Sequence, residues 1–229
     1  MSAALGWGAL AASSLILGAV LGLVHVWPDR LVGLVLAFGA GALISAVSFD
    51  LAQEGVKVGG GAAVAIGLAA GALTYYGANR LLERKFGGAN AGPALALGAF
   101  LDGIPEQTVL GITLASGGGV GVGLLAAIFV SNLPEAIGSA SAMHASRARI
   151  AGLWVAVAIV CTLASVTGYL IADSASGAFQ GGVNGFAAGA LLVMLTDSMF
   201  PEARKKGGDA AGLVTVLGFA VAAALTTLA

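Results

Sequence analysis

Charged residues are scarce in this sequence, where they make up 9% of 229 residues, against about 25% in an ordinary soluble domain. Hydrophobic residues make up 59%. The single cysteine, Cys161, excludes a disulfide within the chain. Because it lies in an apolar run, we interpret it as a small buried hydrophobic residue. The composition indicates a polytopic membrane protein.

The motifs of soluble catalysis are also missing. The sequence contains no HExxH pattern, no Gly-rich phosphate loop between a strand and a helix, and no nucleophile paired with a histidine inside an apolar stretch. The basic residues fall in short connections, where membrane topology accounts for them. We therefore expect no enzymatic activity, no prosthetic group and no nucleic-acid partner.

Eight apolar stretches have the length of a membrane-spanning helix, which is about 20 residues. The connections are too short to hold a further domain, so we predict one all-α transmembrane domain over residues 1–229. Trp7, Trp27 and Trp154 lie near the ends of these stretches, and we interpret them as anchors at the membrane interface. The predicted helices cover about residues 4–27, 31–52, 58–80, 93–115, 119–142, 150–172, 182–202 and 209–228.

Lysine and arginine lie almost entirely on one side of this predicted topology. Nine of the ten fall in the connections after the first, third, fifth and seventh stretches, and Lys57 is the exception. Because basic connections stay in the cytoplasm, both termini are predicted to lie outside. The short loops and the abundance of Gly and Ala favour a prokaryotic inner (plasma) membrane.

An internal repeat links the second and seventh stretches. Residues 38–54 align without a gap on residues 186–202, so the two copies are 148 residues apart and each ends on a glutamate. The two stretches cross the membrane in opposite directions in the predicted topology. We therefore expect an inverted repeat that relates the first three spans to the last three.

Two of the apolar stretches carry the same small polar insert near their middle. One insert reads Asp102-Gly-Ile-Pro-Glu106, and the other reads Ser131-Asn-Leu-Pro-Glu135. On a helix, residues four apart share a face, so Asp102 lies with Glu106 and Ser131 lies with Glu135. Each proline also leaves one backbone carbonyl without its usual helical partner. Carboxylates, a hydroxyl and freed carbonyls are the groups that bind a metal cation.

Seven carboxylates fall within or at the edges of the predicted spans, and no Lys or Arg lies at comparable depth. An ionised side chain at the centre of a membrane helix costs about 2.5 to 3.5 kcal/mol. Protons, through raised pKa values, or a metal ion must therefore supply the opposite charge. We predict a path for cations with Asp102, Glu106 and Glu135 at its centre, Asp50 and Glu54 at its outer mouth, and Asp197 and Glu202 at its inner mouth.

These motifs resemble the ZIP (Zrt/Irt-like) family of divalent metal transporters. That family has eight spans with both termini outside, and it carries His-Asn-x-Pro-Glu-Gly in the fourth span and a similar motif in the fifth. Residues 102–107 and 131–136 match these motifs in part. The resemblance implies a 3+2+3 helix arrangement, a homodimer in lipid, and movement of a metal substrate of the Zn²⁺, Fe²⁺ or Mn²⁺ class into the cytoplasm.

The sequence departs from the family at several ligand positions. Asp102 and Ser131 stand where the family has histidine, and Gly103 stands where it has asparagine. Carboxylate in place of imidazole makes a site harder, although intrinsic affinity still ranks Zn²⁺ above Mn²⁺. We expect one metal position between the fourth and fifth spans. Its first candidate ligands are Asp102, Glu106, Ser131 and Glu135, and its second candidates are Gln107 and Asn132.

Three functions are compatible with this pattern. The first is a ZIP-type carrier of a divalent cation that works by alternating access. The second is a proton-coupled carrier of a small organic cation, in which the same acids relay protons. The third is a protein of ZIP fold that no longer transports and acts as a sensor or an assembly partner. The missing histidines favour the third, and the retained Glu106 and Glu135 favour the first.

Overall fold

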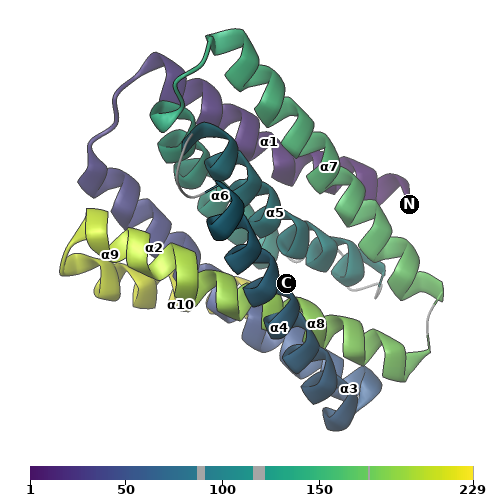
Figure 1. Ribbon diagram of the computed structural model, residues 1–229. Helices are drawn as coiled ribbons and strands as arrows, with labels where there is room; N and C mark the ends of the chain where they lie inside the picture. The colour runs from purple at the N-terminus through teal and green to yellow at the C-terminus, as the bar shows by residue number, and fades with distance from the viewer. Residues whose placement is uncertain (87–90, 116–121, 175, 229) are drawn as a thin grey trace.

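The computed structural model describes the backbone of residues 1–86, 91–115, 122–174 and 176–228. Within these ranges, the side chains of residues 85, 86, 91–99, 102, 122, 142, 173, 174 and 226–228 lie outside the description. The described residues are helical along nearly their whole length (Figure 1). The elements are α1 (Ser2–Val24), α2 (Asp29–Ala46), η1 (Val47–Gln53), α3 (Glu54–Gly59), α4 (Gly61–Phe86), α5 (Ala91–Ala115), α6 (Val122–Ala142), α7 (Arg147–Ser174), α8 (Gly177–Met194), η2 (Leu195–Met199), α9 (Phe200–Gly207) and α10 (Ala210–Leu228).

Two long helical rods contain a π-helical segment in their interior. The first rod joins α2, η1 and α3, and the second joins α8, η2 and α9. Both rods were predicted to be shorter, at 31–52 and 182–202. Both rods continue past the predicted ends, because the polar residues there still form helical hydrogen bonds. They end at Gly60 and Gly208, whose φ values of 82° and 67° belong to a conformation that favours glycine.

The two rods are copies of one another in their bounds. Their starts, the first residues of their π-helical segments and the glycines that end them all lie 148 residues apart, the same offset as in the sequence repeat, although η2 is shorter than η1. The end of each rod is also built alike, since Gly60 N–H donates to the Val56 carbonyl and Gly208 N–H donates to the Arg204 carbonyl, both at 3.0 Å. The repeat therefore extends over the whole of each rod.

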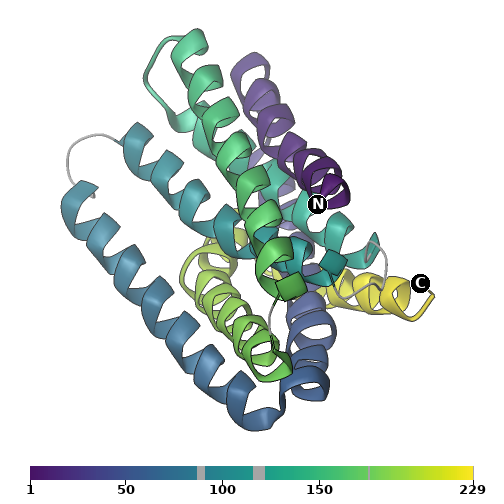
Figure 2. The ribbon, with the colours of Figure 1, turned by 90° about the vertical axis from the view of Figure 1, so that its right-hand side faces the viewer.

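The helices that pack on the two rods are also equivalent in the two copies of the repeat. α2 packs against α10, and α8 packs against α4. Figure 2 shows α4 and α8 as neighbouring helices. A Cβ added to Gly218 in α10 would strike the Phe38 carbonyl oxygen, and a Cβ added to Gly71 in α4 would strike the Phe186 carbonyl oxygen. Phe38 and Phe186 are equivalent in the repeat. Each rod therefore packs at the same position against a glycine of its neighbouring helix, which allows close approach of the two backbones.

The remaining helices form a second group, in which α1 packs against α6 and α7, and α5 packs against α7. Figure 1 shows α1 and α7 side by side, with α5 and α6 between them and the α2, α9 and α10 side of the molecule. Gly22 of α1 lies against the Ile137 carbonyl, and Gly168 of α7 lies against the Thr108 carbonyl. Each carbonyl comes three residues after a motif proline. Glycines of α1 and α7 therefore allow these helices to pack closely against α6 and α5, which carry the motifs.

Among the described residues, six helices are long and apolar enough to cross a membrane, and α10 contributes a shorter apolar helix. The chain is an integral membrane protein made of helices, as the sequence predicted. One prediction was wrong in detail. Trp154 does not anchor the interface, because it is 0% exposed and packs in a core cluster with Leu15 of α1 and Ala136 of α6.

Candidate metal site between α5 and α6

Both motif prolines lie inside continuous helices. Pro105 is internal to α5 and Pro134 is internal to α6, so each removes one backbone N–H donor without ending its helix. Residues 102 and 106, and residues 131 and 135, therefore lie one helical turn apart, as predicted. The backbone of Asp102 belongs to α5, but its side chain is outside the described residues, and its assignment as a ligand stays a prediction.

A contact between Glu106 and Ser131 brings the two motifs together. The Glu106 side chain is 1% exposed, Ser131 is 0% exposed, and the Ser131 hydroxyl lies 3.3 Å from Glu106 Oε1. The same hydroxyl lies 3.0 Å from the Ile128 carbonyl oxygen of its own helix. A hydroxyl has one proton and can donate it to either acceptor. Rotation of Ser131 can therefore release the carboxylate without moving the backbone.

Glu135 and Cys161 lie beside this contact. Glu135 is half-buried on α6, one turn after Ser131. Cys161, on α7, is a fully buried thiol that forms no disulfide. A Cβ added to Gly103 would lie 2.6 Å from its sulfur. The site is therefore bounded by three helices, α5, α6 and α7.

Two buried amides adjoin the predicted ligands. Gln107 is 0% exposed and Asn132 is 1% exposed. Within the described part of the chain, neither polar atom of the Gln107 side chain has a hydrogen-bond partner, and Asn132 Nδ2 has none. A buried polar group without a partner costs about 1 to 3 kcal/mol. Both amides thus have hydrogen-bonding capacity left for a ligand or for its water shell.

The ligands do not converge on one point in this conformation. Among the residues that the structure describes, no three Asp, Glu, His or Cys side chains are placed to hold one metal ion. The structure joins Glu106 to Ser131 and sets Glu135 near them, but a complete coordination sphere would require rotation of these side chains.

The acids predicted at the two mouths lie along the rods. Asp50 falls in η1 and is half-buried, whereas Asp197 falls in η2 and is exposed. π-helical segments inside helices are frequent at functional sites. They are the feature that sequence reasoning missed here, because a single extra residue in a helical turn leaves the apolar pattern almost unchanged.

The two terminal glutamates have basic partners that the sequence analysis did not assign. Glu54 Oε2 lies 3.2 Å from Lys57 Nζ, and Glu202 Oε1 lies 2.8 Å from Lys206 Nζ. Their spacings of three and four residues on a helix could have indicated both pairs. Partly exposed pairs of this kind contribute about 0 to 1 kcal/mol to stability, so neither pair holds the end of its rod strongly in place.

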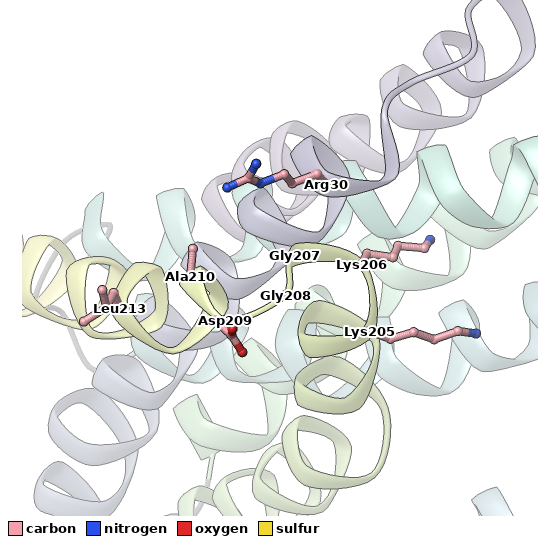
Figure 3. A pocket seen from close by; sticks show the side chains of 8 residues that line it. All are labelled: Arg30, Lys205, Lys206, Gly207, Gly208, Asp209, Ala210 and Leu213. Carbon is pink, nitrogen blue, oxygen red and sulfur yellow. The ribbon is translucent and has the colours of Figure 1, made fainter.

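Lys206 also reaches toward the motif helix α6. A Cβ added to Gly138, three residues after Glu135, would lie 3.2 Å from Lys206 Nζ. Lys206 borders an open cavity of about 600 Å³ at the junction of α2, α9 and α10. In Figure 3 the side chains of Lys205 and Lys206 extend away from Arg30, so the three cations do not converge on one ligand.

The fold and the site define an integral membrane protein with a buried carboxyl group, that of Glu106, where two proline-containing helices meet. No protein-family model matches the chain. The chain is similar to a candidate zinc transporter of Arabidopsis thaliana, with 33% identity over 189 residues that cover 76% of this chain. The matched region is 30% of the plant protein's length, so the chain spans less than a third of that relative.

Proposed function

We propose that this chain is a ZIP-like transporter that moves a divalent metal cation of the Zn²⁺, Fe²⁺ or Mn²⁺ class across the membrane toward the cytoplasm. The observation that carries the proposal is the 3.3 Å contact between Ser131 and Glu106, which joins two apolar helices through their buried polar inserts. Similarity to a candidate zinc transporter supports the same class of substrate.

Charge balance supports a cation as the substrate. The α5 and α6 sequences contain two glutamates and one aspartate but no Lys or Arg. A carboxylate as buried as Glu106 is costly in hydrocarbon unless a positive charge accompanies it. A divalent cation bound between Glu106 and Glu135 would offset both negative charges, and protons would replace it after release.

The packing supports a mechanism of alternating access. We propose eight spans in a 3+2+3 arrangement, with the two rods, α4 and α10 forming a scaffold and α1, α5, α6 and α7 forming the moving unit. The equal offset of both rods and the matched glycine contacts at Phe38 and Phe186 support an inverted repeat. Movement of the second group against the first would expose the site to each side in turn.

The proposal is tested by uptake of Zn²⁺ and Mn²⁺ into proteoliposomes that contain a metal-sensitive dye. We expect uptake by the unmodified chain and none by Glu106→Gln/Glu135→Gln. Glu83→Gln is the matched control, because Glu83 is exposed and pairs with Arg80 on the surface. Equal uptake by the double variant and the control would refute the proposal.

A second candidate is a protein of ZIP fold that no longer transports and acts as a sensor or an assembly partner. The specific observation in its favour is that no three Asp, Glu, His or Cys side chains in the described part of the chain surround one point. This candidate predicts no uptake, whether or not the purified protein binds metal, which a rise in thermal stability would measure. Uptake above that of empty liposomes would exclude it.

A further inference from the structure

Cys161 lies at the centre of the second helix group rather than in lipid. It is 0% exposed and belongs to a core cluster with residues of α1, α6 and α7. Its sulfur occupies the space above Gly103, where any larger residue would meet it. Gly103 belongs to the α5 motif, so the thiol packs against this motif three residues before Glu106.

The unpartnered Gln107 lies on the same face of α5 as Gly103. Residues 103, 107 and 111 are spaced by four and form one stripe on the helix. Gly103 meets Cys161, and Gly111 meets the Ser165 carbonyl one turn farther along α7. The helical spacing therefore places Gln107 between them, on the face of α5 that meets α7. Both polar atoms of its side chain are unpaired among the described residues. Unused hydrogen-bonding groups beside a buried thiol indicate a place for a polar ligand.

We propose that Cys161 is a ligand of the transported metal, contributing a thiolate from α7 that joins Glu106 and Glu135. This inference rests on the proposed function and deepens it. Metal binding would displace the thiol proton to solvent and form a metal–sulfur bond. These three donors do not surround one point in the described conformation, so metal binding requires rotation of the Cys161 and glutamate side chains. Gln107 would then hydrogen-bond the bound water or carboxylate.

A thiolate changes which metal the site prefers. Carboxylate and hydroxyl oxygens alone suit Mn²⁺ and Mg²⁺, whereas a soft sulfur donor favours Zn²⁺ and Cd²⁺. The site would thus regain through sulfur part of the zinc affinity that imidazole would have supplied. The substrate class becomes Zn²⁺ and similar soft divalent cations.

The test titrates the purified chain in detergent with Cd²⁺ and follows the ultraviolet charge-transfer band of a cadmium–thiolate bond. Because the chain has one cysteine, any such band arises from Cys161. We expect a band that saturates in the unmodified chain and is absent from Cys161→Ser and Cys161→Ala. Zn²⁺ affinity should fall at least about tenfold in both variants, while Mn²⁺ affinity should change less than about twofold.

The outcomes separate this inference from the proposed function. Metal uptake by the unmodified chain without a cadmium–thiolate band would overturn the role of Cys161 and leave transport intact. Absence of any metal binding or uptake would overturn both. Should neither cysteine variant fold, as judged by gel filtration, the band of the unmodified chain decides the question alone. Ser165→Ala, four residues along α7, controls for a general disturbance of that helix.

Discussion

The contact between Gly103 and Cys161 makes a sharp prediction for Gly103→Ala. Nonbonded heavy atoms pack at about 3.5 to 4.0 Å, and a new Cβ would lie 2.6 Å from the Cys161 sulfur. Such overpacking costs about 1 to 3 kcal/mol. The gain of a helix-favouring residue returns about 0.5 to 1 kcal/mol. We therefore expect the free energy of unfolding to fall by about 1 kcal/mol in the unmodified background.

Removing the sulfur should reverse the sign of this effect. In Cys161→Ala the atom that collides is gone, so Gly103→Ala should stabilise that background by about 0.5 to 1 kcal/mol. The coupling energy of the double-mutant cycle is then about 1 to 3 kcal/mol. Denaturant titration in detergent micelles, followed by tryptophan fluorescence, measures all four proteins.

The control for the helix-propensity gain is Gly152→Ala, on α7, where no described atom lies within 4 Å of the added Cβ. It should raise stability by the same small amount in both cysteine backgrounds. Additive effects of Gly103→Ala and Cys161→Ala, within about 0.5 kcal/mol, would show that the two residues do not touch. That result would refute the packing of α7 on the motif, and the ligand role of Cys161 with it.

Three further predictions concern the site and the rods. Ser131→Ala should weaken metal binding several-fold in calorimetric titrations, because it removes the 3.0 Å and 3.3 Å contacts of a candidate ligand; unchanged affinity would exclude this hydroxyl. Gly218→Ala and Gly71→Ala should each lower stability by about 1 to 3 kcal/mol in denaturant titrations, since both collide with a backbone carbonyl; a loss at one position alone would contradict the matched packing of the rods. Lys206→Gln should change stability by less than about 1 kcal/mol yet speed metal uptake in liposomes, because it removes a positive charge beside Gly138; slower uptake would argue that Lys206 guides the cation.

The features that repeat along the chain could be predicted from the sequence. Apolar stretches and the alternation of basic connections predicted an all-helical membrane protein, and the match of residues 38–54 with 186–202 predicted the likeness of the two rods. That likeness proved longer than the match, because the bounds of each rod depend on backbone geometry at Gly60 and Gly208. Glycines are too common in this sequence for two of them to indicate a helix end.

The features that escaped prediction depend on contacts between distant segments. Trp154 lies in an apolar run near the end of a predicted span, where neither spacing nor neighbours distinguish an interface anchor from a buried residue. It is 0% exposed, because α7 packs against α1 and α5 along the face that carries it. This burial is seen only in the packing of the three helices, because a hydrophobic pattern alone does not predict which neighbour a membrane helix will face. The burial of Cys161 was predicted, but its contact with Gly103 was not.

The same packing links Cys161 to one departure from the ZIP motif, the glycine at residue 103. The resemblance places an asparagine donor where this chain has Gly103, which removes a ligand from α5. The space left by that missing side chain is the space that the Cys161 sulfur occupies, at 2.6 Å from the position of a Cβ. An asparagine at residue 103 would collide with the Cys161 sulfur where it now lies, so the cysteine side chain would have to rotate away. The loss of an oxygen donor on α5 therefore leaves the space in which α7 places its sulfur beside the motif.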